Sequence, residues 1–317
     1  MSLDRIKASI GVLPEVAAWP QMAELVERIR PGGPLSVWEL PFAACEAVGG
    51  SPEAALPGSA AILCSLISLH LVDDMLDDDP AGDYHRLGAG PAANLALAFQ
   101  AAGQQLLAEA PQDTRSALQA SLSRMALATA FGQSLDAREL EDEDEYWQVV
   151  GAKTSPLFGA AFAIGALLGG APAALSAPLG RLGGSLGLCI QVSDDLLDAL
   201  RTPAAADWHR RPNNLALLYA MTADHPERDR FLELSARPDD PAALAAAQEI
   251  LVRSGAASYC VFKMIEILEE ARSLLAGLPL AAPAALSRLF DAQARSIRHL
   301  FESAGAADAA TLSWSPP

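Results

Sequence analysis

Residues 186–198 read LGLCIQVSDDLLD, an apolar run that ends in the pattern D-D-x-x-D. Residues 62–77, ILCSLISLHLVDDMLD, have the same construction. Positions i and i+4 of a helix share a face, with Cβ atoms about 5–6 Å apart, so each pattern places two carboxylates on one side. The apolar run before each pattern favours a helix that is substantially buried. Two buried helices that carry aspartates therefore predict an all-α fold.

The rest of the chain supports this fold class. Helix formers dominate, aromatic residues make up only 6% of the sequence, and no run of β-branched residues suggests a strand. Apolar residues recur at helical spacing, for example at Leu118, Leu122 and Met125. The breaks rich in proline and glycine are short. We expect a single large helical bundle of about ten to twelve helices, one domain over residues 1–317, with its core at about 15–300 and frayed termini.

The net charge and the cysteines bear on the partners and the compartment of the protein. Against 22 Lys and Arg stand 39 Asp and Glu, so the net charge is -17. Such a surface repels phosphate backbones, and we expect no nucleic acid partner. The mean hydropathy of +0.20 argues against disorder over most of the chain. Four widely spaced cysteines in apolar runs indicate core thiols in a reducing, cytoplasmic compartment.

Two apolar windows raise the question of a membrane. Residues 55–72 and 159–179 are long enough to span a bilayer, but the first contains Pro57 and His70 and the second is interrupted by glycines and Pro172. Buried helices of a large bundle explain both windows better, so we expect no transmembrane segment.

The paired aspartates point to a metal ion. Like charges on one helix face are destabilising, and burying several carboxylates without a counter-ion is prohibitive. A hard divalent cation solves this problem, and Mg2+ is the natural choice where phosphate is also a ligand. A solvated acidic face is the alternative, but two copies of the pattern make it less favoured. A calcium loop from Asp77 is rejected because its twelfth position is Gly88. The candidate ligands are Asp73, Asp74, Asp77, Asp194, Asp195 and Asp198.

Further motifs follow the aspartates in a fixed order. Residues 131–136 read FGQSLD, Tyr146 precedes the triplet 152–154, AKT, and residues 214–220 read NLALLYA. With the two aspartate motifs, these segments make the sequence resemble the polyprenyl synthetase family of trans-isoprenyl diphosphate synthases, in the class I isoprenoid synthase superfamily. The resemblance extends from about residue 32 to about residue 290, and it implies a helical bundle around a central active-site cavity.

The resemblance also implies a reaction and the residues that perform it. An allylic prenyl diphosphate would bind with three Mg2+ ions held by Asp73, Asp77 and Asp194. The other three, Asp74, Asp195 and Asp198, would be further ligands or would support the ligands from behind. The substrate would then ionise and transfer its prenyl group in isoprenoid biosynthesis. Catalytic roles would fall to Lys153, Thr154, Gln133 and Gln191, although helix-packing hydrogen bonds are the alternative for the two glutamines. The substrate diphosphate would contact Lys153, Arg86, Arg210 and Arg211. A cytoplasmic homodimer is expected.

The sequence departs from the family where isopentenyl diphosphate should bind. Residues 32–37, GGPLSV, lack the expected basic residues, Leu66 replaces a histidine, and only Arg86 remains of a basic pair. Three hypotheses follow: a prenyltransferase with an unusual acceptor or weak isopentenyl diphosphate binding, a terpene synthase acting on one prenyl diphosphate, and a non-catalytic partner subunit. Neither Ser68 nor Leu69 is aromatic, which suggests room for a longer prenyl chain.

Overall fold

The computed structural model describes residues 2–31, 36–209 and 213–303, with side chains as far as His299. Within these ranges the chain forms sixteen α-helices, two 3-10 helices and no strand, which confirms the all-α prediction. The first half contains α1 (Leu3–Gly11), α2 (Pro14–Ala18), α3 (Pro20–Arg28), η1 (Val37–Glu39), α4 (Leu40–Ala47), α5 (Pro52–Leu76), α6 (Tyr84–Leu87), α7 (Ala89–Ala108) and α8 (Gln112–Asp136). The second half contains α9 (Glu143–Lys153), α10 (Ser155–Leu168), α11 (Ala173–Leu200), η2 (Ala206–Trp208), α12 (Leu215–Thr222), α13 (Arg228–Ser235), α14 (Pro241–Arg253), α15 (Ala256–Ala276) and α16 (Ala284–Ser303).

The described residues form more helices than the expected ten to twelve, because prolines divide helical stretches. Pro14, Pro20 and Pro156 each stand in the first turn of a helix, where a fixed φ is tolerated and no amide hydrogen is needed. The segment before residue 30 is therefore three short helices, and the apolar stretch around Lys153 is divided into α9 and α10. The expectation of frayed residues after Ser303 lies outside the described residues.

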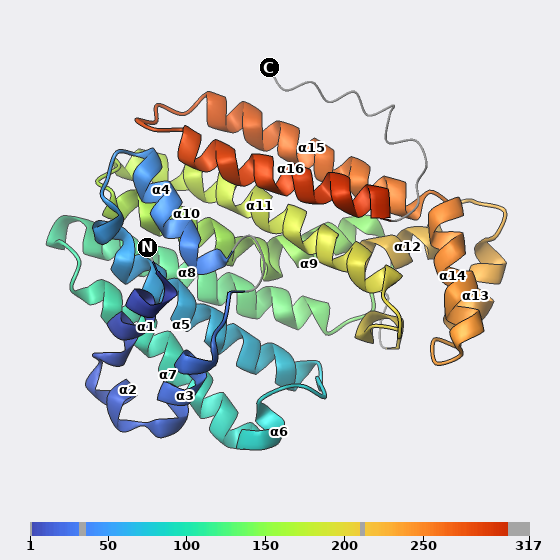
Figure 1. Ribbon diagram of the computed structural model, residues 1–317, viewed down its shortest axis with the longest axis horizontal. Coiled ribbons are helices and arrows are strands. Elements are labelled where there is room, and N and C mark those ends of the chain that lie inside the picture. The colour runs from blue at the N-terminus through green and yellow to red at the C-terminus, as the bar shows by residue number, and fades with distance from the viewer. Residues whose placement is uncertain (1, 32–35, 210–212, 304–317) are drawn as a thin grey trace.

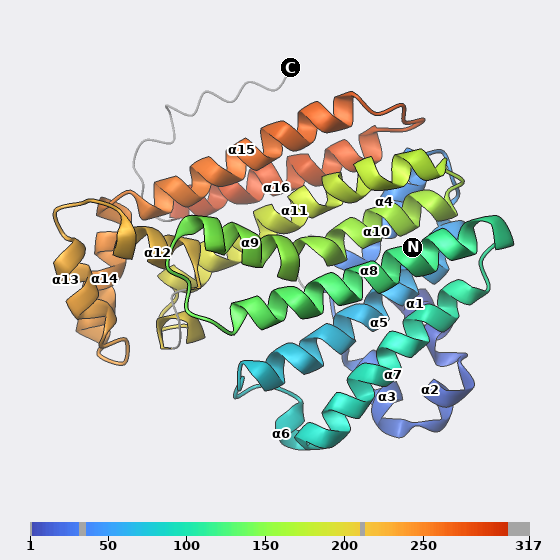
Figure 2. The ribbon, with the colours of Figure 1, turned by 180° about the vertical axis from the view of Figure 1, so that it is seen from behind.

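The long helices form the body of the bundle (Figures 1 and 2). Helix α10 lies at its centre and packs against α11, α4, α8 and α5, while α7 packs against the other side of α5. Helices α15 and α16 cover α11, and α12, α13 and α14 gather at one end. This arrangement brings the second half of α5 and the second half of α11, which carry the two aspartate motifs, to opposite sides of the space beside α10.

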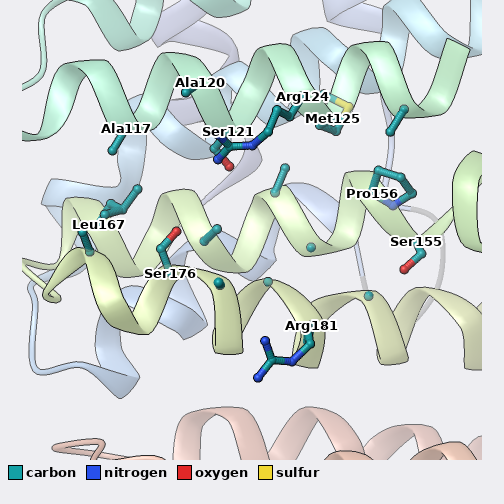
Figure 3. Close-up of a pocket in the computed structure, with 18 of the residues that line it drawn as sticks. Ala117, Ala120, Ser121, Arg124, Met125, Ser155, Pro156, Leu167, Ser176 and Arg181 are labelled. Carbon is teal, nitrogen blue, oxygen red and sulfur yellow. The ribbon is translucent and has the colours of Figure 1, made fainter. Parts of the chain in front are cut away.

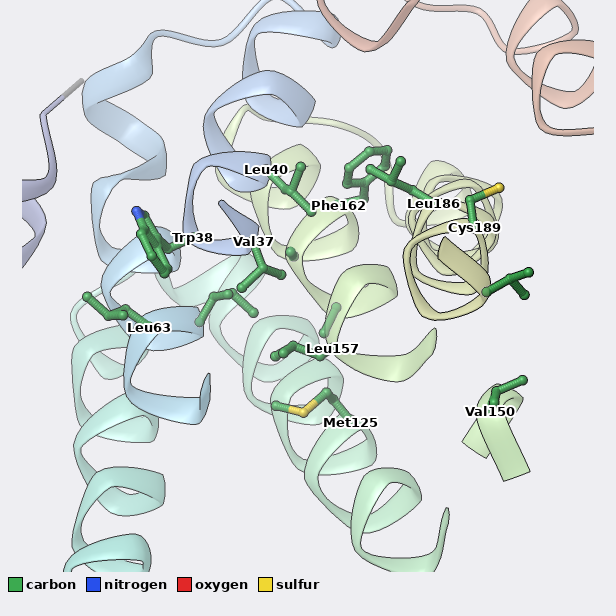
Figure 4. Close-up of a cluster of buried hydrophobic side chains, with 14 of the residues drawn as sticks. Val37, Trp38, Leu40, Leu63, Met125, Val150, Leu157, Phe162, Leu186 and Cys189 are labelled. Carbon is green, nitrogen blue, oxygen red and sulfur yellow. The ribbon is translucent and has the colours of Figure 1, made fainter. Parts of the chain in front are cut away.

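Apolar side chains from distant segments fill the interior (Figure 4). Trp38, Leu63, Met125, Phe162 and Leu186 are all buried although they come from five different elements. Each such side chain contributes roughly 1.5–3 kcal/mol by leaving water. The four cysteines are buried and unbridged, as the prediction of core thiols requires.

Close helix approach in the core depends on small residues. A Cβ at Gly183 of α11 would overlap the backbone carbonyl of Phe158 on α10. Glycine therefore sets the distance between these two helices.

Three helical segments are long and apolar enough to cross a membrane: Pro52–Leu76, Glu143–Leu168 and Ala173–Leu200. In the first, 67% of the most apolar window is buried inside the bundle, against 39% in the third. Packing thus accounts for much of the hydropathy of α5 but for less of that of α11. The absence of a transmembrane segment stays a prediction.

Candidate active site

A cavity of about 500 Å³ opens beside the two aspartate motifs. Helices α5, α7, α8, α10 and α11 contribute most of its walls, and Lys153 and Thr154 lie where α9 gives way to α10. Most lining side chains are apolar or small, including Leu66, Leu69, Leu97, Leu157, Phe158 and Ile190. The charged or titratable lining residues among those described are Asp73, Asp194, Lys153 and His70.

Lys153 connects the first aspartate motif to helix α8. Its Nζ lies 2.6 Å from Asp136 Oδ2 and 3.1 Å from Asp73 Oδ1. Gln133, one turn before Asp136 on α8, donates a hydrogen bond from Nε2 to the same Asp73 oxygen. Burial by itself lowers the pKa of Lys153, but the two carboxylates outweigh it and hold this pKa above its usual value. The lysine is therefore a permanent cation at the wall of the cavity.

The position of Lys153 depends on a glycine. A Cβ at Gly132 would overlap the backbone of Ala152 and Lys153, so α8 and the end of α9 touch main chain to main chain. This contact brings Gln133 and Lys153 to the same carboxylate, that of Asp73. In the segment FGQSLD, the glycine allows the close backbone contact with α9, and Gln133 and Asp136 provide the polar contacts to Asp73 and Lys153.

Asp136 was part of that motif, but no role was predicted for it. Besides Lys153 it contacts Asn213, whose Nδ2 donates to Asp136 Oδ1 at 3.0 Å and to the Asp136 carbonyl at 2.8 Å. Asp136 therefore orients the lysine and anchors the segment before α12. Its spacing from Gln133, three residues along one helix, was the signal that could have placed it near Asp73.

A chain of hydrogen bonds runs from the cavity wall into the core. Thr154 Oγ1 donates to Gln191 Oε1 at 2.7 Å, and Gln191 Nε2 donates to Asp195 Oδ1 at 2.9 Å. On the far side, Tyr146 OH donates to Asp195 Oδ2 at 2.6 Å. This chain fixes the orientation of the Gln191 amide, because Asp195 can only accept when it is ionised.

Asp195 is a core residue. Its side chain is 3% exposed, and it does not line the cavity. Burial raises its pKa to about 7, while the hydrogen bonds from Tyr146, the Leu215 amide and Gln191 act in the opposite direction. Of the two roles predicted for it, metal ligand or support behind the ligands, the geometry favours support, because both carboxylate oxygens are engaged by protein donors.

The neighbouring aspartates of the second motif face differently. Asp194 lines the cavity, and desolvation together with the adjacent Asp198 raises its pKa to about 6. Desolvation also raises the pKa of Asp198, against the effect of Arg201, whose guanidinium lies 4.0 Å away. Asp194 and Asp198 thus match the predicted pair of carboxylates on one helix face.

In the first motif, Asp73 is the residue that lines the cavity. Asp77 caps the end of α5, where its backbone amide donates to the Asp73 carbonyl at 2.8 Å. Desolvation and the charge of Asp79 raise the pKa of Asp74. The first motif therefore mixes a cavity-facing carboxylate with others near the turn that follows the helix.

The donor set suits Mg2+ that arrives with a phosphate ligand. Among the described residues, no three His, Cys, Asp or Glu side chains are grouped closely enough to hold an ion by themselves. Mg2+ characteristically uses one or two carboxylates and completes its coordination with water and substrate phosphate. Asp73 and Asp194 from opposite helices supply that kind of incomplete oxygen site.

Of the three arginines predicted to contact the diphosphate, the described one, Arg86, does not line the cavity. Arg86 on α6 lies 3.2 Å from Glu24 Oε1 and 3.1 Å from Asp83 Oδ1, and it is not a lining residue. Its role toward a diphosphate stays a prediction. Arg210 and Arg211 lie outside the described residues, as do residues 32–35, where basic side chains were expected to be missing. Leu66, in the place of the expected histidine, does line the cavity.

A second hollow, of about 640 Å³, lies between α8, α10 and α11 (Figure 3). Its walls are mainly alanine, glycine and serine, and Arg124 and Arg181 stand on α8 and α11. None of its described lining residues is an Asp or Glu. Of the two cavities, the first is therefore the one with carboxylates that could hold a metal ion.

Comparisons with known proteins agree with the geometry. A sequence model for the family described as Polyprenyl synthetase matches residues 43–251. The short chain isoprenyl diphosphate synthase of Methanothermobacter thermautotrophicus is 29% identical over 309 residues, covering 87% of this chain and 93% of that protein. The nonaprenyl diphosphate synthase of Mycobacterium tuberculosis is 29% identical over 257 residues, 73% of each chain. The crystal structure of a polyprenyl synthetase from Streptomyces coelicolor has a TM-score of 0.78 at 21% identity, over 92% of this chain and 95% of that one.

Proposed function

The chain belongs to the polyprenyl synthetase family, and on that premise we propose that it ionises an allylic prenyl diphosphate and transfers the prenyl group in isoprenoid biosynthesis. One observation carries the proposal: a permanent cation, Lys153, and carboxylates from two different helices, Asp73 and Asp194, face one largely apolar cavity. A diphosphate requires the cation and the metal that the carboxylates hold, and a prenyl chain requires the apolar walls.

The residues divide the work of ionisation. Asp73 and Asp194, with Asp77 and Asp198 beside them, would hold Mg2+, which when bound neutralises charge on the diphosphate. Lys153 donates hydrogen bonds to the departing diphosphate as the C–O bond breaks and its electron pair leaves with the oxygen. Asp136 and Gln133 keep the lysine and Asp73 in register. The apolar walls exclude water from the allylic cation.

Thr154 and Gln191 would act on the carbon side of that bond. Their hydrogen bond places two polar side chains at the cavity wall, and Asp195 behind them fixes the amide direction. An oriented amide and hydroxyl stabilise positive charge without any reorganisation at the moment of reaction.

The allylic cation can react with a second substrate, isopentenyl diphosphate, as in chain elongation. Alternatively it can react with a group of the same prenyl chain. Elongation by isopentenyl diphosphate is the reaction that the family relation favours. A single-substrate terpene synthase reaction is the second candidate, because Lys153 is the only lysine or arginine among the described lining residues and Leu66 lies in the wall. A second diphosphate would lack a cation there. Related synthases range from short chain to nonaprenyl products, so the family leaves product length open.

A homodimer is the assembly we propose. Leu97 on α7 and Leu127 and Phe131 on α8 are 70%, 75% and 61% exposed. These two helices pack against each other, and exposed apolar residues of this size mark association surfaces. We further propose a cytoplasmic location without a nucleic acid partner, in keeping with the reduced cysteines and the net charge of -17.

The function can be tested by incubating the purified protein with Mg2+ and geranyl, farnesyl or geranylgeranyl diphosphate. Each incubation is run with and without isopentenyl diphosphate. Longer diphosphates are expected if the chain elongates, and hydrocarbons or alcohols without the second substrate if it is a terpene synthase. No release of diphosphate under either condition would exclude both reactions. The variant Asp73→Ala is expected to be inactive, and full activity in it would exclude the site.

A further inference from the structure

The second hollow is larger than the catalytic cavity, at about 640 Å³ against about 500 Å³. It stays open because the three helices around it present short side chains: Ala117, Ala120 and Ala128 on α8, Gly159 and Ala163 on α10, and Ala177 and Gly180 on α11. A Cβ at Gly159 would lie only 2.8 Å from the Gly180 carbonyl oxygen, so α10 and α11 meet there through their backbones. Sites for small molecules typically have volumes of about 300–1,000 Å³, and the hollow falls within that range.

Two arginines make this hollow electropositive. Arg124 on α8 and Arg181 on α11 line it on either side of α10 (Figure 3). Neither guanidinium forms an ion pair or a hydrogen bond with any of the described residues. None of the described lining residues is an Asp or Glu, although the chain has a net charge of -17. Because a guanidinium binds phosphate oxygens through parallel hydrogen bonds, two uncompensated arginines here favour a phosphate-bearing ligand.

A buried hydroxyl beside Arg124 provides a second, independent indication of a ligand. Ser121 is 8% exposed and lines the hollow, three residues before Arg124 on the same face of α8 (Figure 3). Within the described part of the chain its hydroxyl has no hydrogen-bond partner. The other buried hydroxyls without a partner, those of Ser59 and Thr129, are closed off from solvent, but the Ser121 oxygen is not among them. Buried polar groups are almost always paired, so this hydroxyl indicates that a polar group of a ligand binds in the hollow.

We propose that the second hollow binds one molecule of a prenyl diphosphate outside the catalytic centre. The diphosphate would lie between Arg124 and Arg181, within reach of Ser121, and the prenyl chain would lie against the small side chains, Met125 and Leu167. The choice of a prenyl diphosphate rests on the proposed function, under which this is the anionic amphiphile that the protein handles. An anionic bilayer is a poorer match, because a hollow of this volume holds a single chain and the net charge of -17 repels such a surface.

The two cavities lie on either side of the junction between α9 and α10. Gly151 and Ser155 line the second hollow, whereas Lys153 and Thr154 line the catalytic cavity. A binding experiment must therefore distinguish the two sites. Chelation of Mg2+ removes the metal-dependent part of binding at the aspartates, and Lys153→Gln removes the remaining cation of the catalytic cavity, while neither change affects the arginines of the hollow.

Calorimetric titration with farnesyl S-thiolodiphosphate, an analogue that resists ionisation, tests the site in the presence of EDTA. We expect one molecule bound per chain, with a Kd that rises about 100-fold in the double variant Arg124→Gln, Arg181→Gln, because each guanidinium loses a charge-assisted contact. The double variant Arg295→Gln, Arg298→Gln removes the same charge from exposed positions of α16 and should keep the parent Kd within about twofold. Lys153→Gln should also keep it.

A substitution that fills the hollow tests the place of the prenyl chain. A Cβ at Gly180 would lie 3.6 Å from its nearest neighbour, an ordinary contact, and leucine is a better helix former than glycine. Gly180→Leu should therefore melt at or above the parent temperature and lose binding of the farnesyl analogue. Unchanged binding in this folded variant would overturn the assigned position of the chain.

The remaining outcomes separate this site from the proposed function. No binding in EDTA, or a Kd that the Arg124 and Arg181 substitutions leave within about twofold, would overturn the site even if the protein releases diphosphate with Mg2+. Cosedimentation with phosphatidylglycerol vesicles that needs both arginines, without binding of the monomeric analogue, would overturn it in favour of a membrane contact. Binding that needs both arginines, in a protein that releases no diphosphate from any substrate, would support the site and overturn the proposed function alone.

Discussion

The ammonium nitrogen of Lys153 lies 3.1 Å from Asp73 Oδ1. Asp73 belongs to the first aspartate motif and Lys153 to the segment AKT, 80 positions later in the chain. The lysine is the counter-ion of the first aspartate motif. On the proposed function, Mg2+ bound at that carboxylate would leave the ammonium available to an anionic ligand. The contact would then link metal binding to diphosphate binding.

Removing the positive charge of Lys153 should lower the rate of diphosphate release. Lys153→Gln is expected to lower kcat about 100-fold, as loss of one preorganised donor does elsewhere, because the departing diphosphate loses its hydrogen-bond donor. Steady-state release of diphosphate measures the effect. Lys263→Gln is the matched control, since Lys263 lies 3.0 Å from Glu266 and does not line the cavity. Equal kinetics in the two variants would contradict the role of Lys153.

The Mg2+ requirement should depend on pH. The pKa of Asp194 is raised to about 6, and only the ionised carboxylate binds metal, so the Mg2+ concentration for half-maximal rate should rise as the pH falls through about 6. Titrations at pH 5.5, 6.5 and 7.5 check this trend. In Asp194→Asn the requirement should be higher throughout and its pH dependence flatter. Asp113→Asn, on the exposed first turn of α8, should behave as the parent.

The buried end of the hydrogen-bond chain should contribute to stability. Tyr146→Phe leaves Asp195 Oδ2 without its phenol donor and is expected to lower the free energy of unfolding by about 1–3 kcal/mol. Tyr84→Phe removes a similar bond to Asp78 at an exposed site and should cost much less. Urea denaturation measures both.

The same pair predicts a pH dependence. The folded pKa of Asp195, about 7, lies above the roughly 3.9 of an unfolded aspartate, so the folded state holds more protons between these values. Its contribution to stability therefore falls as the pH rises through that window. Without the Tyr146 hydroxyl the pKa rises further, and the deficit of Tyr146→Phe should be larger at pH 8 than at pH 5. An equal deficit at both pH values would contradict this account of Asp195.

The surface formed by Leu97, Leu127 and Phe131 should hold the dimer together. Leu127→Glu combined with Phe131→Glu is expected to convert a dimer into a monomer, because it places charge in an apolar interface. Light scattering coupled to gel filtration gives the mass. Phe262→Glu, at an exposed phenylalanine on α15, should leave the mass unchanged. A monomeric parent protein would show that this surface serves another purpose.

Sequence reasoning reached the fold class because it depends on short-range pattern. Apolar runs, helical spacing and the absence of strand-like segments are local properties, and the structure has the same all-α character over the described residues. The number of helices was harder to predict, because Pro14 and Pro20 each stand in the first turn of a separate short helix.

The sequence did not show which aspartate of the second motif faces the cavity and which faces the core. Adjacent residues of a helix point about 100° apart, so Asp194 faces the cavity and Asp195 faces the core, but the pattern D-D-x-x-D does not reveal which is which. The burial of Tyr146 and the contact with the Leu215 amide decide it, and both are tertiary. Likewise, Asp136 and Asn213 meet across 77 residues, and Arg86 meets Glu24 across 62. A sequence motif gives the identity and spacing of residues, but it does not show which distant residues they contact.

The backbone contact at Gly132 has a consequence for how the protein can vary. Charged residues of the site have conservative substitutes, since an arginine or an asparagine preserves part of the interaction. Position 132 has none, because the smallest added side chain would push apart the helix that holds Gln133 and the helix end that holds Lys153. The position of the candidate site that is least able to accept another residue is therefore Gly132, which contributes no side chain to it.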